Sequence, residues 1–489
     1  MSVFRSLRRE RPFSIPARSD SALLELGEFE AGALDADPDN KQLAWAFDRA
    51  MRAAARGGWD VHELSSIAPR TIVTSVPEGF AFYGLTPDMY TRAAVRFFDE
   101  CRPEQVVVTG IRSIGTTLSA VVAAALEERG AIVERLLVRP EGHPFDRGVK
   151  LRRQATDEWI AIVDEGPGLS GSSFCGTARA WLDAGARSDR IVFFPSWDPD
   201  PSQLCSEQAR TMWRQHRRYV GEYVPPFDGI DISAGMWRKH WLPRSRWPAV
   251  DPRYERRKYL LPDGMAKFHG LGLYGAPAWD LSQQLEGFVP HVRQGPDGYL
   301  IHDVVDEVIA PDCDREFIEH VSRYLCHRKQ LPAGEGAGFD EICEMIRMNV
   351  PDAPDLERFR SLIEDQPKVP VDGRMAPHEW IRTQNGFLKT DAVDHCRDHF
   401  YPGCQDIAWD IAGVSEEWEI DPELLCHRVG GERLQERVAF YRVAYLALRL
   451  GLAELGRQTE DGPLFEKQAK HHRIRLRKRL TSAGRYRAL

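Results

Sequence analysis

The sequence has no apolar run that approaches the ~20 residues needed to cross a bilayer as a helix, so we expect no membrane span. Its nine cysteines are scattered and include no CxxC pair, which argues against a disulfide framework and favours reduced thiols in the cytoplasm. The basic N-terminus lacks the apolar core and the small-residue cleavage site of a secretory signal. A strong excess of one charge is also missing: the net charge is −8, so nucleic acid is an unlikely partner.

What is present indicates a globular protein of several domains. Hydrophobic residues make up 43% and charged residues 28% of the 489 positions, and a chain of this length exceeds one ordinary core. A homo-oligomer is compatible with this composition. We divide the chain into a polar N-terminal extension at 1–40, an α/β domain at 41–215, a connector or hood at 216–254 and a further domain at 255–489.

Strand-like and helix-like segments alternate between about 41 and 215. The strand-like runs are QVVVTG, AIVERLLVR, WIAIVDE and RIVFFPS, and the helix-like runs are TTLSAVVAAALEERG and SSFCGTARAWLDAGA. Glycine closes both helical runs, as is common at helix C-termini. This order predicts a parallel sheet with helices on both faces.

The run WIAIVDE ends in Asp164 and Glu165, and a loop of small residues follows. Ligands bind outside the carboxyl ends of strands in open parallel sheets. Backbone N–H groups of such a loop and the positive end of the next helix suit a phosphate, while two acids suit ribose hydroxyls or Mg²⁺. The pattern predicts a sugar-phosphate site, and a tight turn with a capping serine is the structural alternative. The phosphate-binding candidates are Gly168, Ser170, Gly171, Ser172 and Ser173.

These elements resemble the phosphoribosyltransferase family over about 105–195. The family signature is an apolar strand, two acids, a small-residue loop and a helix start rich in Gly and Thr. A pyrophosphate loop after an earlier strand is matched by Arg112, Ser113 and Gly115, and a mobile basic segment is matched by Arg139 and Arg147. Solvated surface charges are the alternative for these last two arginines. The acid loop is about one residue longer than in the family and contains a proline.

The resemblance implies Mg²⁺-dependent transfer of a phosphoribosyl group from phosphoribosyl diphosphate to a base or another small acceptor. Asp164 and Glu165 would hold the ribose diol, with Asp164 also a metal ligand. Arg112 and the basic segment would stabilise the departing pyrophosphate, because a preorganised cation acts where negative charge develops. No protein nucleophile is needed for this chemistry, so the lack of a Ser-His-Asp signature does not exclude catalysis.

The C-terminal half resembles the aminoglycoside-phosphotransferase type of small-molecule kinase over about 255–455. Strand-like pieces come first and long helical pieces last, which predicts a two-lobed α+β domain. Lys267 lies on a strand, Glu286 on a following helix, and Asp391 ends a later strand before the segment QDIAWDIA. The resemblance implies that Lys267 and Glu286 hold the phosphates of ATP and that Asp391 binds Mg²⁺.

One departure from the kinase pattern changes the expected chemistry. The segment RMAPHEWIRTQNGFLKTD has no Asp at the place of the family's catalytic base. Glu379 substitutes as the base, or the domain binds a nucleotide without transferring phosphate, or it is a decayed scaffold. The sequence therefore predicts a bifunctional enzyme, an N-terminal phosphoribosyltransferase fused to a kinase-like domain. The alternative is a non-catalytic sensor of a nucleotide or of phosphoribosyl diphosphate.

Overall fold

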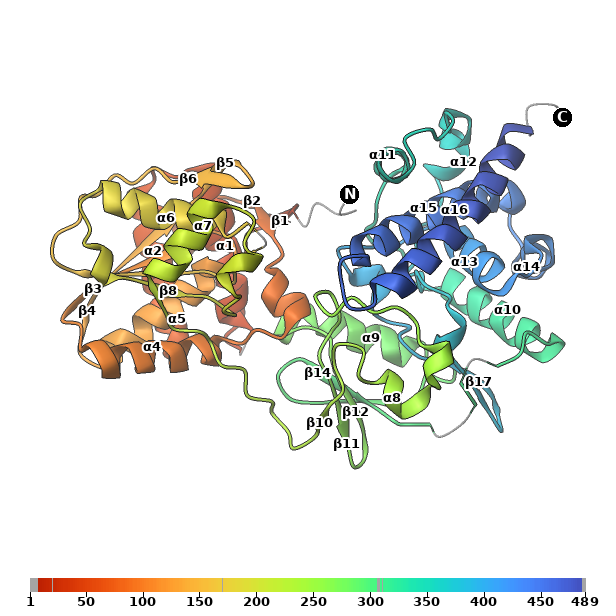
Figure 1. The fold of residues 1–489 in the computed structure, drawn as a ribbon, viewed down its shortest axis with the longest axis horizontal. Coiled ribbons are helices and arrows are strands. Elements are labelled where there is room, and N and C mark those ends of the chain that lie inside the picture. Colours follow the sequence, from red (N-terminus) through yellow and green to blue (C-terminus); the bar gives the residue numbers. More distant parts are fainter. Residues whose placement is uncertain (1–7, 20, 169, 306–307, 310, 486–489) are drawn as a thin grey trace. The chain divides into compact units, whose positions relative to one another are not determined.

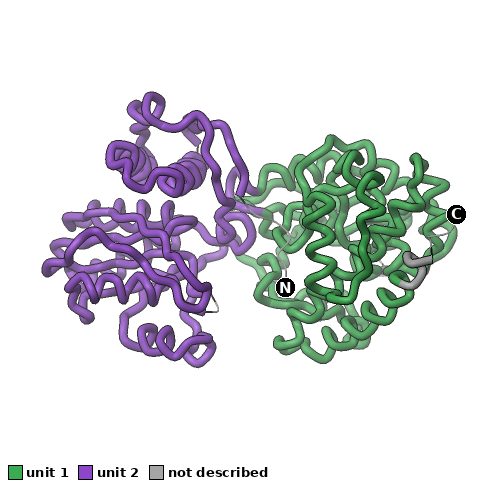
Figure 2. Tube along the Cα trace, turned by 90° about the horizontal axis from the view of Figure 1, so that it is seen from above, with its two compact units in different colours: residues 1–6, 228–269, 275–489 green, residues 7–227, 270–274 purple. Residues whose placement is uncertain are grey.

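The computed structural model describes residues 8–19, 21–168, 170–305, 308–309 and 311–485. It divides the chain into two compact units, which Figure 2 colours purple and green. The first unit along the chain, purple in Figure 2, contains the described residues between 8 and 227 together with Gly270–Tyr274. The second, green in Figure 2, contains Asp228–His269 and the described residues from Gly275 onward. Among the described residues, no helix has both the length and the apolar character needed to cross a membrane.

A five-stranded parallel sheet forms the centre of the first unit (Figure 1). In spatial order its strands are β4 (Ile132–Val138), β3 (Gln105–Ile111), β7 (Trp159–Val163), β8 (Ile191–Phe194) and β9 (Arg217–Arg218). All neighbouring pairs are parallel. The chain adds β4 on one side of β3 and then β7 on the other, so the topological switch point lies between β3 and β7. Ligands of open parallel sheets bind at such a point.

Apolar side chains cover both faces of this sheet. Val106 and Val108 pack toward the helices on one face, whereas Val107 and Ile160 pack toward those on the other. The helices are α4 (Pro87–Cys101) and α5 (Ile114–Glu128) on the first face, and α6 (Ser172–Asp183) and α7 (Glu207–Gln215) on the second. Because successive side chains of a strand point to opposite faces, a sheet covered twice needs continuous apolar runs. The predicted parallel sheet is confirmed.

The N-terminal segment is packed into the first unit, whereas its polar composition suggested an extension outside the α/β domain. Helix α1 (Ala22–Ala36) is buried along most of its length, and its Gly27 lies so close to Thr117 of α5 that no Cβ would fit. Two acids of this helix, Glu28 and Glu30, are buried, which is why composition alone misplaced it. The neighbouring elements are α2 (Lys41–Ala55), α3 (Leu64–Ile67) and the antiparallel pair of β1 (Arg8–Pro12) and β2 (Thr71–Ser75).

The predicted connector at 216–254 is divided between the two units. Residues up to 227 belong to the first, where Tyr219 packs into the core beside the sheet. From Asp228 onward the chain belongs to the second unit, where β10 (Ile230–Asp231) pairs with the edge of its sheet and α8 (Arg238–Trp241) follows.

The second unit combines antiparallel sheets with a helical part, as its sequence predicted. The larger sheet has the order β10, β11 (Lys258–Leu261), β12 (Gly264–Phe268), β14 (Tyr299–His302) and β13 (Val292–Gln294), and the smaller has β15 (Val308–Ile309), β16 (Trp380–Thr383) and β17 (Gly386–Lys389). Helix α9 (Ala276–Gln284) lies between β12 and β13 in the chain. The remaining helices are α10 (Arg315–Lys329), α11 (Phe339–Asn349), α12 (Arg360–Ile363), α13 (Ala408–Trp418), α14 (Pro422–Val429), α15 (Leu434–Gly456) and α16 (Gly462–Arg485). One apolar cluster joins these helices to α9, β13 and β14.

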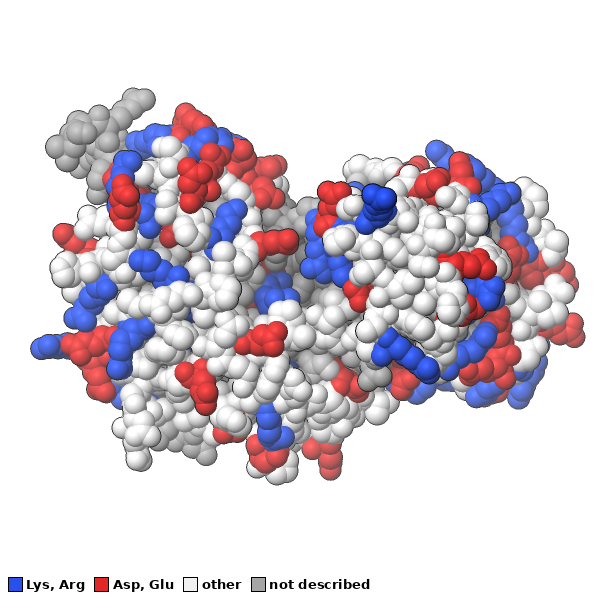
Figure 3. Space-filling model, turned by 180° about the vertical axis from the view of Figure 1, so that it is seen from behind, with Lys and Arg blue, Asp and Glu red and all other residues white. Residues whose placement is uncertain are grey.

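Charged side chains of both signs are interspersed on the surface. Figure 3 shows Lys and Arg beside Asp and Glu over the face in view, without a broad field of one sign. On that face, long-range attraction of a polyanion would therefore be weak.

Candidate functional site

The two loops that the sequence predicted separately lie against each other at the switch point of the parallel sheet. A Cβ on Gly115, in the first turn of α5, would lie 2.7 Å from the carbonyl oxygen of Val163 and 3.3 Å from Oδ1 of Asp164. Only glycine permits this approach without displacing the backbone of β7. Ser113, immediately before α5, has a φ of 142°, a region that side-chain-bearing residues rarely adopt. Such strain is often found where a ligand is held.

Protein hydrogen bonds orient the acid pair without neutralising it. The hydroxyl of Tyr90 donates to the backbone carbonyl of Asp164 at 2.8 Å, and the N–H of Gly79 donates to Oε2 of Glu165 at 3.0 Å. Among the described residues, neither carboxylate has a cation within ion-pair distance.

The pKa values of these two acids reflect the missing cation. Both side chains keep a partly exposed face, yet the surrounding protein desolvates them. Burial raises the pKa of Asp164 to about 7, although the charges of Arg139 and Arg147 oppose the shift. Burial, assisted by repulsion from Glu78 and Asp164, raises the pKa of Glu165 to about 8. A desolvated acid pair of this kind suits a ligand that brings a cation or hydroxyl donors.

The loop 166–173 ends at the N-terminus of α6. Gly171 precedes the helix with a φ of 64°, and the Oγ of Ser172 donates to the carbonyl of Pro144 at 2.6 Å. The Oγ atoms of Ser170 and Ser172 are 3.0 Å apart. Gly168 is exposed, and Ser170 and Ser173 are half-buried. The N-terminus of α6 and the hydroxyls of Ser170 and Ser173 suit an anion. Ser172 is already engaged, because its N–H donates to the Oγ of Ser170 at 3.3 Å and its hydroxyl to the carbonyl of Pro144.

Helix α1 holds two of the basic residues that we expected beside the leaving group. Arg112 donates to the carbonyl of Leu34 and lies 3.3 Å from Oδ1 of Asp35. The Nε of Arg139 donates to the same Oδ1 at 3.0 Å, and its Nη1 donates to the backbone carbonyl of Arg112 at 2.7 Å. Asp35 thus positions both arginines. Nothing local in the sequence identified it, because it lies in a different predicted domain from the loops that it orders.

Arg147 lies in a hairpin that packs on α6. The hairpin pairs β5 (Glu141–His143) with β6 (Asp146–Gly148), and Arg179 of α6 donates to the carbonyl of Arg147 at 3.1 Å. The basic segment of the sequence therefore lies beside the helix start that follows the acid loop.

The second unit contains a cavity of about 320 Å³. Its wall combines aromatic side chains with a dense set of acids and bases. The lining residues include Trp237, Trp241, Tyr254, Phe400, Lys267, Glu379, Asp391 and His395.

Lys267 forms ion pairs with Asp391 and Asp394 instead of the predicted pair with Glu286. Glu286 is exposed and lies beyond the end of α9, because the chain leaves the helix after Gln284 and turns at Gly287 with a φ of 85°. Burial opposes the charge on Lys267, but the two aspartates outweigh it and hold the pKa of the amine above its usual value. The predicted Lys267–Glu286 pair is therefore wrong. Asp394 was missed because no motif that we identified includes it, and only the folded chain brings it to Lys267, 127 residues away.

The surroundings of Glu379 also differ from those that a general base needs. It forms ion pairs with Arg374 and with Lys389, whose Nζ lies 3.0 Å from Oε2. Burial opposes ionisation of Glu379, but Arg374 and Lys389 outweigh it and lower the pKa of the carboxyl group. A carboxylate held ionised by two cations accepts a proton poorly, so these contacts disfavour Glu379 as the base.

Magnesium fits one of its two predicted sites better than the other. Asp164 and Glu165 offer carboxylate oxygens, the donors that Mg²⁺ prefers, and no cation of the described residues is paired with them. Asp391 is already paired with Lys267, and the donors that converge with it are Glu379 and the imidazole of His395. An imidazole suits transition metals and not Mg²⁺, so the fit at Asp391 is poor.

Comparisons with known proteins found kinases for the C-terminal half. No family model matches the sequence, and no curated protein matches it. A choline/ethanolamine kinase family protein from Mesorhizobium loti is 15% identical with a TM-score of 0.35, over 46% of this chain and 85% of its own. LicA in complex with AMP is 13% identical with a TM-score of 0.33, over 47% and 88%. The GDP complex of aminoglycoside 2'-phosphotransferase-IIIa is 11% identical with a TM-score of 0.34, over 47% and 92%. None of these three structures is a phosphoribosyltransferase.

Proposed function

We propose that the first unit binds phosphoribosyl diphosphate with Mg²⁺ and transfers its phosphoribosyl group to a base or another small acceptor. The observation that carries this proposal is the uncompensated pair Asp164 and Glu165, next to the loop 112–115 at the switch point of a parallel sheet. Two adjacent carboxylates accept hydrogen bonds from vicinal hydroxyls, and the loop at the start of α6 offers N–H donors to a phosphate. One ligand that presents both groups at this spacing is a ribose phosphate.

In the proposed reaction, the bond between the anomeric carbon and pyrophosphate breaks as the bond to the acceptor forms. Positive charge develops on the sugar ring, which the acid pair would stabilise in its ionised form, and negative charge develops on pyrophosphate. Arg139 and Arg147 lie within electrostatic reach of the acids, because their charges lower the pKa of Asp164. A bound Mg²⁺ would supply further positive charge for the phosphates.

Calorimetric titration with phosphoribosyl diphosphate and Mg²⁺ tests the proposal. Wild type should bind, and the double variant Asp164→Asn, Glu165→Gln should bind at least about 100-fold more weakly, because each lost charged hydrogen bond contributes about 1.5–3 kcal/mol. Asp183→Asn, an exposed acid on α6, is the matched control and should bind normally. Release of pyrophosphate with a panel of bases, amines and carboxylic acids then tests transfer. Equal affinity in wild type and double variant would refute the assignment of the site.

For the second unit we propose binding of a nucleotide without phosphoryl transfer. The supporting observation is Arg374, which lies in the segment where the related kinases carry their catalytic Asp and which neutralises Glu379. Lys267 lines the cavity, and we propose that it contacts the phosphates of the nucleotide. At 100 times its dissociation constant, a nucleotide should add about 2.7 kcal/mol to the free energy of unfolding.

A thermal-shift assay with ATP tests this second proposal. Lys267→Met should abolish the shift, whereas Lys467→Met, an exposed lysine of α16, should retain it. An unchanged shift in Lys267→Met would contradict the assignment. Transfer of phosphate to any member of a panel of small alcohols and amines would contradict the absence of catalysis.

A further inference from the structure

Two aromatic rings from distant parts of the chain lie beside each other in the wall of the second unit's cavity. Trp237 directly precedes α8, and His378 lies in the short turn before β16. Their rings are nearly parallel, with an angle of 21° between the planes, and their centroids are 6.2 Å apart. Both residues line the cavity of about 320 Å³, and both are half-buried. Each ring therefore keeps accessible surface beside a space that a small molecule can enter.

The spacing of the two rings leaves little direct contact between them. Rings stacked in contact have planes about 3.5 Å apart, so parallel rings with centroids at 6.2 Å either overlap only at their edges or leave a gap between their faces. In the first arrangement the two rings form a platform for a third ring. In the second, a third ring needs about 7 Å between the faces, which a shift of roughly 1 Å in one side chain would provide. Both arrangements present aromatic faces that a planar ring covers well.

Hydrogen bonds hold Trp237 by the edge of its indole. Its Nε1 donates to Oε1 of Glu255 at 2.6 Å. Glu255 is itself fixed, because it accepts hydrogen bonds from the N–H of Gly235 at 2.5 Å and from Nζ of Lys258 at 2.6 Å. These bonds use the edge of the indole and not its faces. A ring held in place before a ligand arrives loses little conformational freedom on binding.

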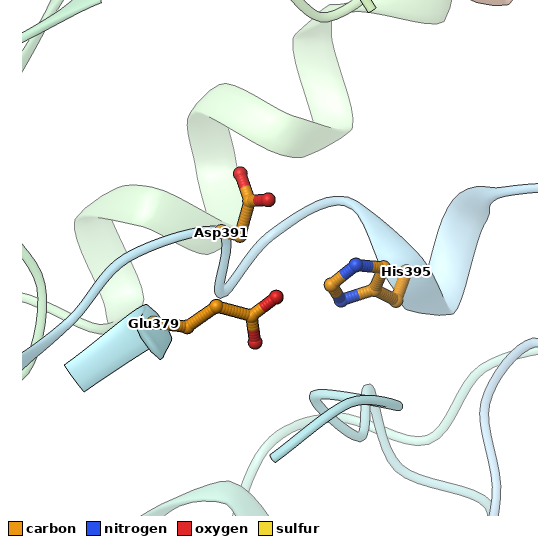
Figure 4. A group of neighbouring side chains, drawn as sticks. All are labelled: Glu379, Asp391 and His395. Atoms are coloured by element: carbon orange, nitrogen blue, oxygen red, sulfur yellow. The ribbon is translucent and has the colours of Figure 1, made fainter. Parts of the chain in front are cut away.

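His378 presents an uncharged ring. Burial lowers the pKa of His378 to about 4, although the charge of Glu379 opposes the shift. Within the described part of the chain its ring forms no hydrogen bond, and its Nε2 lies 3.9 Å from Oε1 of Glu379. Figure 4 shows that the carboxylate of Glu379 points toward Asp391 and His395, which also line the cavity. The imidazole is therefore neutral and lies next to the ionic wall of the cavity without being part of it.

The charges around His378 balance each other. Two acids and two bases lie within electrostatic reach, because they act on its pKa in opposite directions: Glu379, Glu417, Arg374 and Arg449. Surroundings of this kind attract neither a cation nor an anion strongly. The ring pair therefore favours a ligand group without net charge.

We propose that Trp237 and His378 bind an uncharged planar aromatic ring by stacking. The ring is the base of the nucleotide proposed for this unit, in which case the inference rests on that function, or it belongs to a separate ligand. Leu452 of α15 and Phe465 of α16 line the same cavity and supply apolar contacts for such a ring. Loss of one aromatic stacking partner typically weakens the binding of a base at least about fivefold.

Calorimetric titration of the full-length protein with 2-naphthol and with decahydro-2-naphthol tests the stacking site. Both probes are uncharged at neutral pH, and only 2-naphthol is planar. Wild type should bind 2-naphthol at least about fivefold more tightly than the saturated probe. Trp237→Leu and His378→Leu should each weaken the binding of 2-naphthol at least about fivefold, because each removes one aromatic face.

Two further variants separate stacking from other effects of these substitutions. Trp237→Phe keeps a ring but loses the hydrogen bond to Glu255, and it should bind 2-naphthol within about threefold of wild type. Trp279→Leu, at a half-buried position of α9 outside the cavity lining, is the matched control and should bind like wild type. Near-UV circular dichroism reports whether each variant folds, and His378→Leu decides the test if Trp237→Leu does not fold.

ATP and inorganic tripolyphosphate distinguish the two sources of the ring. If the ring is the base of the nucleotide, ATP should displace 2-naphthol, and Trp237→Leu should weaken ATP binding at least about fivefold without changing the affinity for tripolyphosphate. If the ring belongs to a separate ligand, 2-naphthol should bind equally with and without ATP, and Trp237→Leu should leave the affinity for ATP unchanged. Wild type that binds 2-naphthol through Trp237 but does not bind ATP would refute the nucleotide proposal and support the stacking site.

Three results would overturn the stacking site itself. These are no binding of 2-naphthol to wild type, equal affinity for 2-naphthol and its saturated counterpart, and an unchanged affinity for 2-naphthol in the folded Trp237→Leu or His378→Leu variant.

Discussion

Removal of the charges from the acid pair should stabilise the first unit while abolishing its proposed ligand site. The folded state raises the pKa of Asp164 from 3.8 to about 7 and that of Glu165 from 4.5 to about 8. The change in each pKa corresponds to at most about 4–5 kcal/mol of the free energy of unfolding. Both side chains remain partly exposed and titrate as a pair, which reduces the effect. We therefore expect the double variant Asp164→Asn, Glu165→Gln to have a free energy of unfolding about 1–3 kcal/mol higher than wild type.

The advantage of the double variant over wild type in free energy of unfolding should increase as the pH rises. Between about pH 4 and about pH 8 the folded wild type binds more protons than the unfolded chain, so its free energy of unfolding falls as the pH rises. The double variant lacks these two titrations. The difference in stability between variant and wild type should therefore be small near pH 4 and largest near pH 8.

Urea unfolding of both proteins at several pH values measures this difference. Asp183→Asn, at an exposed position, is the control and should follow wild type throughout. Added Mg²⁺ with phosphoribosyl diphosphate should stabilise wild type and leave the double variant unaffected. The reasoning would be refuted by a double variant that is less stable than wild type near pH 8, or by a difference that does not change with pH.

Three other predictions concern the first unit. Arg135→Met should destabilise it by about 3–5 kcal/mol in urea unfolding, because it leaves Glu30, at 1% side-chain exposure, as an unpaired buried carboxylate; a cost below about 1 kcal/mol would contradict this. Asp35→Asn should release Arg139 from its ion pair and weaken the binding of pyrophosphate at least about threefold in calorimetry. Unchanged or tighter binding of pyrophosphate would contradict this. Trp197→Ala removes a 46% exposed indole at the carboxyl end of β8. It should raise the KM for an aromatic acceptor about tenfold without changing the affinity for the sugar phosphate. An unchanged KM with a changed sugar-phosphate affinity would place the acceptor elsewhere.

Local sequence patterns were sufficient for most of the secondary structure. The apolar run at 105–110 became β3, and the Ala-rich run before Gly130 became α5, because strand and helix periodicity depend on near neighbours. The acid loop was likewise visible, since a strand, two acids and a run of small residues are contiguous in the chain. By contrast, α1 was misplaced, because its buried Glu28 and Glu30 depend on Arg11 and Arg135, which other segments supply.

The residue types at each strand end and the order of the elements follow from the sequence alone. Which of those acids have a resident cation follows only from the folded chain. Within the described part of the chain Asp164 and Glu165 have none, whereas Asp391 is paired with Lys267 and Glu379 with Arg374. The sequence showed acids of the same kind in both halves. Charge compensation depends on distances of a few ångströms between side chains that can be more than a hundred residues apart, and only the folded chain sets those distances.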